Sequence, residues 1–151
     1  MQVKRIAGAL GAEIKGVDLG QILTPEISIA IRDLLNEHEV LFFRQQAIEP
    51  AQQRDLAAIF GPLQTHPAYG TVAGIPEVMI LESTVDKPSK IEVWHSDMTF
   101  RQHPPSVTVL RGMVIPNVGG DTLFASMTSA YDSLSEGMKI YLEGLVAVHD
   151  F

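Results

Sequence analysis

A histidine and an aspartate two residues apart, set among aromatic side chains, are the residues most able to do chemistry. They are His95 and Asp97, in the motif WHSDMTF at residues 94–100. On a strand, side chains two apart project from the same face, about 6.5–7 Å apart along it. One imidazole nitrogen and one carboxylate oxygen can therefore converge on one ion. Such a pair supplies two of the three ligands of the two-histidine, one-carboxylate set that suits Fe(II) and leaves coordination positions open.

A His-x-Asp pair by itself also fits a simpler interpretation. Asp97 would then accept a hydrogen bond from a backbone amide in a surface turn. Against this, a histidine and an aspartate flanked by Trp94, Met98 and Phe100 would be costly inside a core unless they shared a partner. The residues alone leave both interpretations open. If the pair does bind a metal ion, a third protein ligand must come from elsewhere in the sequence.

Helices and short strands precede the pair. Residues 3–17 alternate weakly and contain three glycines, which predicts a hairpin. Thr24 followed by proline and glutamate is typical of a helix start, and apolar residues at helical spacing extend that helix to about His38. The apolar run 40–43 predicts a buried strand. A second helix is expected from about Glu49 to Phe60.

The pattern changes after the second helix, and strands become more frequent than helices. Since strands and helices do not alternate regularly, a doubly wound sheet is disfavoured and an α+β domain built on antiparallel strands is expected. The expected elements are a loop at 63–75, a strand at 78–81, a polar connection at 86–90, strands at 94–100, 106–113 and 122–126 (the last after a Gly119-Gly120 turn), and a closing helix at 130–145.

Composition restricts the classes of function. The chain has 151 residues, of which 46% are apolar, enough for one domain with a core. Its net charge is −7 and its basic residues are scattered, which disfavours nucleic acid and anionic membranes as partners. The absence of cysteine excludes disulfides, zinc ribbons and thiol catalysis. No signal segment or membrane-length apolar run occurs, so we expect a soluble, cytoplasmic protein.

Several blocks of sequence occur together in a specific order. The motif around the pair is followed by PPSVTVLRG, GGDTLFAS and AYDSLSEGMKIYLEGLVAVHDF, and is preceded by GAEIKGVDL, HEVLFFRQQAIEPAQQRDLAAIFGPL and HPAY. In their order and spacing these blocks resemble the TauD/TfdA family of Fe(II)/2-oxoglutarate-dependent dioxygenases, over nearly the entire chain. Within the family, the strongest likeness is to enzymes acting on taurine and related sulfonates or alkyl sulfates.

The resemblance implies both a fold and a reaction. The fold would be α+β, the N-terminal part of a double-stranded β-helix (jelly-roll, clavaminate synthase-like) with flanking helices, incomplete in this chain. Residues 1–151 would form the N-terminal portion of a single dioxygenase domain. With Fe(II), 2-oxoglutarate as co-substrate and O₂, the enzyme would hydroxylate a small sulfonate or sulfate ester and release succinate and CO₂. Members of the family are often dimers or tetramers, so the resemblance is also compatible with a homo-oligomer.

The resemblance also implies roles for individual residues. His95 and Asp97 match the first two iron ligands. Thr122 matches a threonine that bonds the distal carboxylate of 2-oxoglutarate, although by itself it fits a hydroxyl at a strand start after a Gly-Gly turn. His66 and Tyr69 match two residues that face the substrate. A histidine can donate to a sulfonate oxygen and a tyrosine supplies a hydroxyl and a wall, although an ordinary surface loop would also explain them.

Two further residues bear on the substrate. Met98 follows the second ligand, where the family offers its backbone or a small side chain to the substrate pocket. Ile91 stands where taurine-specific members carry a polar residue near the amine. An apolar Ile91 therefore favours a substrate without an amino group, such as an alkyl sulfonate or sulfate ester. The remaining histidines, for which we expect partial exposure and no role in the site, are His38, His103 and His149.

The sequence departs from the family in the residues that complete the site. The family uses a second histidine and a following arginine, both far C-terminal, and no residue here matches them. Either the chain is half of an enzyme about twice as long, or it is a pseudo-enzyme that binds 2-oxoglutarate or a partner without turnover. A structural zinc module using His66, His95 and Asp97 is disfavoured, because His66 lies in a loop and no fourth ligand presents itself.

Overall fold

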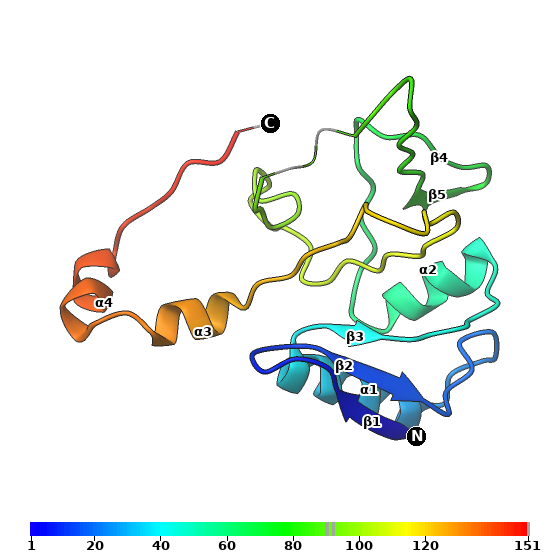
Figure 1. Ribbon diagram of the computed structural model, residues 1–151, viewed down its shortest axis with the longest axis horizontal. Helices are drawn as coiled ribbons and strands as arrows, with labels where there is room; N and C mark the ends of the chain where they lie inside the picture. Colours follow the sequence, from blue (N-terminus) through cyan, green and yellow to red (C-terminus); the bar gives the residue numbers. More distant parts are fainter. Residues whose placement is uncertain (90, 92, 151) are drawn as a thin grey trace. The chain divides into compact units, whose positions relative to one another are not determined.

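The computed structural model describes residues 1–89, 91 and 93–150 (Figure 1). The chain divides into two compact units. Unit 1 comprises residues 1–18, 24–46 and 112–148, and unit 2 comprises residues 19–23, 47–111 and the C-terminal residues from His149. Lys90, the end of the expected polar connection, and Phe151, the end of the expected domain, lie outside the described residues.

Unit 1 contains a three-stranded sheet in the order β1-β2-β3. β1 (Gln2–Arg5) pairs antiparallel with β2 (Ala12–Lys15), which confirms the expected hairpin, and β2 pairs parallel with β3 (Leu41–Phe42). Ala12 and Ile14 of β2 are buried, so alternate residues of this strand face the core of the unit. β3 is only half-buried, whereas the sequence predicted a buried strand.

The first helix begins and ends close to the predicted positions. α1 (Pro25–His38) is capped by Thr24, whose side chain accepts a hydrogen bond from the backbone N–H of Ile27. Hydrogen bonds from its own backbone N–H and from Thr24 hold the pKa of Glu26 below its usual value. Ile31 is buried on the core side. His38 is buried as well, which corrects the prediction of a partly exposed histidine; it ends a helix that contacts β3.

Unit 2 is built on a helix and a small hairpin. α2 (Pro50–Ala58) starts after Glu49, as predicted, and ends two residues short of the expected Phe60. It packs against β5 (Ile75–Met79), which pairs antiparallel with β4 (Thr71–Val72). The buried apolar side chains of this unit come from the helix, the hairpin and the segments before them, namely Leu19, Ile48, Leu56 and Val78.

Three predicted strands are wrong. Residues 94–100, 106–113 and 122–126 form no strand in the structure; they are irregular segments and turns. The first ends in a turn closed by a hydrogen bond from the N–H of Arg101 to the carbonyl of Met98, 3.0 Å. Apolar, β-branched composition favours a strand only where a neighbouring strand supplies hydrogen-bond partners. Within the described residues, these segments have no such neighbour.

The predicted closing helix is two shorter helices. α3 (Met127–Asp132) and α4 (Glu136–Leu142) are separated by a break at residues 133–135, where Ser135 caps α4 by accepting from the N–H of Met138. Serine hydroxyls compete with the helix backbone for hydrogen bonds and so favour such breaks. Neither helix has a buried residue. In the part of the chain that the structure describes, no helix combines the length and the apolar character needed to cross a membrane.

Candidate metal and substrate site

The predicted ligand pair lies in unit 2 and does converge. His95 Nε2 lies 3.4 Å from Asp97 Oδ1, and the two side chains are 51% and 45% exposed. No strand positions them, contrary to the prediction: the backbone is irregular at His95 and enters a turn at Asp97. The two side chains face each other because of this turn and because each is held by a further group.

A backbone carbonyl orients the histidine. His95 Nδ1 lies 2.8 Å from the carbonyl oxygen of Val93. A carbonyl only accepts hydrogen bonds, so Nδ1 carries a hydrogen, and when the ring is neutral its lone pair lies on Nε2. Metal-binding histidines use this arrangement, in which the second ring nitrogen donates to a carbonyl or carboxylate.

A hydroxyl orients the aspartate. Thr108 Oγ1 donates to Asp97 Oδ2 at 2.6 Å, a short distance typical of a charge-assisted hydrogen bond. Because Oδ2 is engaged in this way, Oδ1 is the oxygen turned toward His95. The pair therefore presents one nitrogen lone pair and one carboxylate oxygen to the same point.

This donor set fits a divalent metal ion such as iron. Ligand distances of about 2.0–2.2 Å for imidazole nitrogen and carboxylate oxygen put two neighbouring ligand atoms of one ion at roughly 3.0–3.5 Å. The separation of 3.4 Å between His95 Nε2 and Asp97 Oδ1 lies in that range. No cluster of three or more histidine, cysteine or acidic side chains occurs among the described residues, so a third ligand is not part of them. His149 contacts the hydroxyl of Thr99 at 2.7 Å.

Two of the predicted substrate residues, His66 and Tyr69, share one loop of unit 2. The ring centroids of His66 and Tyr69 are 4.6 Å apart, and His66 also meets Phe100 edge-to-face at 6.0 Å. The N–H of Ala68 donates to His66 Nδ1 at 3.1 Å. Nδ1 is therefore an acceptor, and the proton of the neutral ring lies on Nε2, which makes Nε2 a donor suited to an anionic oxygen.

An arginine joins this loop to the turn that follows the aspartate. Arg101 donates through one guanidinium nitrogen to Gln64 Oε1 at 3.2 Å and through another to the carbonyl of Thr65 at 2.7 Å. Together with the Phe100–His66 contact, these bonds bring the predicted substrate loop and the metal-pair segment into one local structure. The structure thus places His66 and Tyr69 beside the turn that begins at Asp97.

Met98 and Ile91 differ in their surroundings. Met98 has a φ of 52°, a left-handed conformation that is uncommon for a residue other than glycine, and it directly follows Asp97. Strained backbone of this kind is frequent at functional sites. Ile91 is 59% exposed, and its N–H donates to the hydroxyl of Ser89.

Thr122 belongs to unit 1, so its predicted place beside the metal pair remains a prediction. It follows Gly119 and Gly120, whose φ values of 76° and 70° are those of the expected glycine turn. Two contacts hold the segment around it within unit 1. Phe124 meets Phe42 edge-to-face at 5.9 Å, and Ser126 donates to Glu39 Oε1 at 3.0 Å.

The sequence analysis missed Thr108 and Arg101. Thr108 lies between Val107 and Val109, and its hydroxyl between two apolar β-branched residues was a usable signal. Arg101 had no such signal, because Gln64 and Thr65 lie 36 and more residues earlier in the chain.

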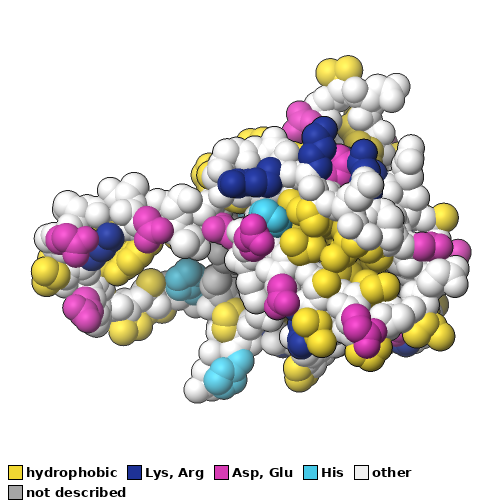
Figure 2. Space-filling view, turned by 90° about the horizontal axis from the view of Figure 1, so that it is seen from below, with side chains coloured by type: hydrophobic (Ala, Val, Ile, Leu, Met, Phe, Trp, Pro, Cys, Tyr) yellow, Lys and Arg dark blue, Asp and Glu magenta, His cyan; other side chains and the backbone are white. Residues whose placement is uncertain are grey.

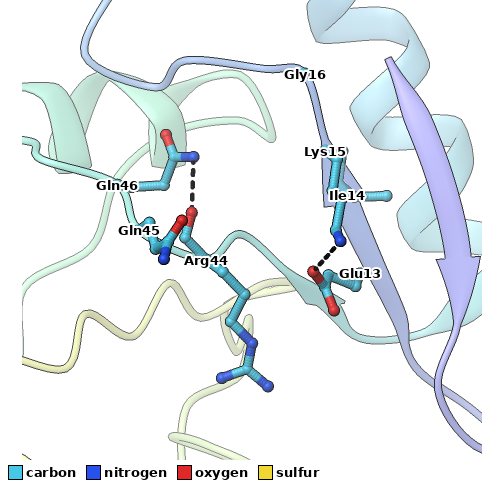
Figure 3. Close-up of a pocket in the computed structure, with 7 residues that line it drawn as sticks. All are labelled: Glu13, Ile14, Lys15, Gly16, Arg44, Gln45 and Gln46. Carbon is cyan, nitrogen blue, oxygen red and sulfur yellow. Dashed lines mark hydrogen bonds and ion pairs between the residues drawn. The ribbon is translucent and has the colours of Figure 1, made fainter.

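The hollow shown in Figure 3 lies in unit 1 and contains none of the predicted site residues. It has a volume of about 610 Å³ and is lined by residues of β2 and of the segment after β3. Two contacts join the residues that line it. Lys15 pairs with Glu13 at 3.4 Å, and Gln46 donates to the carbonyl of Arg44 at 3.2 Å. We assign no function to this hollow.

Comparison with known proteins shows the family to which the chain belongs. Residues 2–151 match the model of the family described as "Taurine catabolism dioxygenase TauD, TfdA family". The chain is 39% identical to an alkylsulfatase of Acinetobacter baylyi over 99% of its own length and 47% of the relative's. It is 34% identical to an alpha-ketoglutarate-dependent sulfate ester dioxygenase of Pseudomonas putida, over 99% of its own length and 49% of the relative's.

The fold agrees with a solved structure. A taurine dioxygenase from Burkholderia xenovorans superposes with a TM-score of 0.82 at 37% identity, covering 95% of this chain and 51% of the other. The chain therefore spans about half the length of the relatives it matches. The structure is α+β with small sheets, consistent with part of such a domain.

Proposed function

Because the chain belongs to the TauD, TfdA family of taurine catabolism dioxygenases, we propose that it forms the N-terminal half of an Fe(II)- and 2-oxoglutarate-dependent dioxygenase domain that hydroxylates a small sulfate ester or sulfonate. The observation that carries this proposal is the pair at residues 95 and 97. His95 Nε2 and Asp97 Oδ1 face each other at 3.4 Å, and His95 Nδ1 lies 2.8 Å from the carbonyl oxygen of Val93. The domain would be a double-stranded β-helix that this chain begins.

The proposed roles follow the local geometry. His95 and Asp97 would hold iron, which together with 2-oxoglutarate and O₂ would supply the oxidising chemistry and leave succinate and CO₂ as co-products. His66 donates from Nε2 to an anionic oxygen of the substrate, and Tyr69, stacked on it, forms a wall beside that oxygen. Thr122 bonds the distal carboxylate of 2-oxoglutarate.

The proposed substrate is a sulfate ester of a small alcohol, with an alkyl sulfonate as the next choice. The similarity to an alkylsulfatase and to a sulfate ester dioxygenase supports this order. Ile91 supports it as well, because an apolar side chain does not recognise the amine of taurine. We assign Met98 to the wall of the same pocket, since its backbone directly follows Asp97.

A panel of substrates tests this proposal. The complete protein is supplied with Fe(II), 2-oxoglutarate and O₂, together with hexyl sulfate, hexanesulfonate or taurine. Hydroxylation of the carbon bound to the ester oxygen or to sulfur breaks the C–O or C–S bond and gives an aldehyde with sulfate or sulfite. We expect the largest O₂ uptake with hexyl sulfate, accompanied by equal amounts of succinate and sulfate.

Two results would contradict the proposal in different ways. Succinate formation without release of sulfate or sulfite from any of the three compounds would reject the substrate class and keep the type of reaction. A preference for taurine would reject the role given to Ile91 alone.

A second function is favoured by one observation for the 151-residue chain alone. Its described residues contain no third metal ligand. We therefore propose that this polypeptide by itself binds 2-oxoglutarate or a partner without turnover. Succinate formation by the isolated 151-residue chain would contradict this second proposal.

A further inference from the structure

The hydrogen bond from Thr108 to Asp97 assigns a role to a residue outside the ligand set. We propose that Thr108 is a positioning residue that fixes the carboxylate of Asp97 for metal binding. This inference rests on the proposed function, because it presupposes that Asp97 binds the metal. The role concerns Thr108 alone. A measurement of the metal affinity of Thr108 variants tests it and does not require turnover.

The geometry shows what the hydroxyl selects. An aspartate carboxylate rotates about its last side-chain bond with little preference between its two oxygens. Thr108 Oγ1 engages Oδ2 at 2.6 Å, and Oδ1 is the oxygen that faces His95 Nε2 at 3.4 Å. Without the hydroxyl, the carboxylate would sample orientations in which neither oxygen faces His95 Nε2.

Thr108 is itself held in place by a helix. The side-chain amide of Gln53, on α2, donates to the carbonyl of Val109 at 3.1 Å. α2 in turn packs against β5. A rigid element therefore fixes the backbone next to Thr108, so that its hydroxyl reaches Asp97 from a defined position. Supporting a ligand from a regular element in this way increases the precision of a site.

Thr108 orients the carboxylate of Asp97 and contributes little to the stability of the fold. Asp97 is 45% exposed and Thr108 is exposed, so water competes for the same hydrogen bond and little folding free energy depends on it. Loss of an outer-shell partner of a metal ligand typically lowers metal affinity about 10–100-fold. A large change in affinity together with a small change in melting temperature is therefore the expected signature.

The experiment is a titration of the complete protein with Co(II), a spectroscopic substitute for Fe(II). Trp94 adjoins His95, so the part of the fluorescence quenching that is lost in Asp97→Ala reports binding close to the pair. The variants are Thr108→Val, which keeps the shape and removes the hydroxyl, and Thr108→Ser, which keeps the hydroxyl. Thr71→Val is the matched control, because this exposed threonine lies on β4 of the same unit. Asp97→Ala serves as the reference for loss of a ligand.

The expected result is a 10–100-fold rise in the Co(II) dissociation constant for Thr108→Val, and a change of less than about threefold for Thr108→Ser and Thr71→Val. The melting temperature of the metal-free Thr108→Val protein should stay close to that of the parent. The inference is overturned if Thr108→Val binds Co(II) like the parent while Asp97→Ala does not, or if Thr108→Ser loses as much affinity as Thr108→Val. If Asp97→Ala also binds like the parent, the metal assignment itself fails, and the inference with it.

Discussion

Two histidines of unit 2 differ in the ring nitrogen that carries the proton, and this difference assigns them different chemistry. His95 donates from Nδ1 to a carbonyl, so its Nε2 lone pair is available to a metal ion. His66 accepts at Nδ1 from the N–H of Ala68, so its Nε2 carries a proton and acts as a donor. Under the proposed function, the same residue type would therefore serve as a metal ligand at one position and as an anion donor at the other.

The tautomer of His66 leads to a prediction about substrate binding. His66→Ala should raise KM for an alkyl sulfate about 10–100-fold, because a hydrogen bond to a charged oxygen contributes about 1.5–3 kcal/mol. His66→Gln should retain much of the affinity, since its amide places a donor near the position of Nε2. His66→Asn should behave like alanine, because its shorter side chain reaches only to the position of Nδ1. Steady-state kinetics with each variant measure these effects.

The KM for 2-oxoglutarate is the internal control for His66. It should stay unchanged, because the proposal gives His66 no contact with the co-substrate. Equal KM values for the glutamine and asparagine variants, or a parallel rise in the KM for 2-oxoglutarate, would show that His66 acts through the loop as a whole.

At the scale of elements, unit 2 joins a loop and a turn that are far apart in the sequence. Arg101, in the segment just after the turn, bonds the side chain of Gln64 and the carbonyl of Thr65, and Phe100 meets His66. An arginine suits this task because its planar guanidinium donates to two acceptors at once. The position of His66 relative to Asp97 thus depends on Arg101 and on the contact between Phe100 and His66.

This dependence predicts the effect of Arg101→Lys. A lysine keeps the charge but cannot make both hydrogen bonds in the same geometry. The hydrogen bonds that hold the loop to this segment should therefore contribute about 1–2 kcal/mol less. We expect KM for the alkyl sulfate to rise roughly 5–30-fold while metal affinity stays within about twofold. Arg54→Lys is the matched control, because Arg54 lies on α2 of the same unit and pairs only with its neighbour Asp55 among the contacts described. If both variants raise KM alike, the contacts of Arg101 do not hold the loop for binding.

Elements with local signals were predicted well. Thr24 before a proline fixed the start of α1, and the apolar alternation around the early glycines gave the β1–β2 hairpin. The segments after residue 93 failed for a physical reason. Their composition favours strands, but a strand exists only where another strand supplies partners, and composition does not say where such a partner lies. The α3–α4 break was missed because Ser135 was given no capping role.

The sequence predicted that the side chains of His95 and Asp97 converge, but it predicted the wrong local structure for them. The spacing of His95 and Asp97 was interpreted as two positions on one face of a strand, and the structure brings the two side chains together in a turn instead. The two side chains converge because His95 is hydrogen-bonded to Val93 and Asp97 to Thr108. The hydrogen bond from Thr108 cannot be inferred from the spacing of His95 and Asp97. Thr122 was inferred from resemblance alone and stays a prediction.

At the scale of the whole molecule, much apolar surface is exposed. Figure 2 shows apolar side chains at the surface of the part that contains α3 and α4, toward the left. Large apolar side chains exposed in this number along one segment favour a contact with other protein. The proposed half-domain requires such a surface. The residues concerned are Met127, Tyr131, Met138, Ile140, Tyr141, Leu142, Leu145, Val146 and Val148.

The central claim is that the pair at residues 95 and 97 binds the iron of a dioxygenase, and one measurement tests it most directly. Fe(II)-dependent conversion of 2-oxoglutarate to succinate is measured for the complete protein and for His95→Ala and Asp97→Ala. Asp86→Ala, in an exposed loop of the same unit, serves as the control. We predict that both ligand variants lose Fe(II) binding and succinate formation, whereas Asp86→Ala keeps both. Iron-dependent turnover retained by either ligand variant would contradict the account.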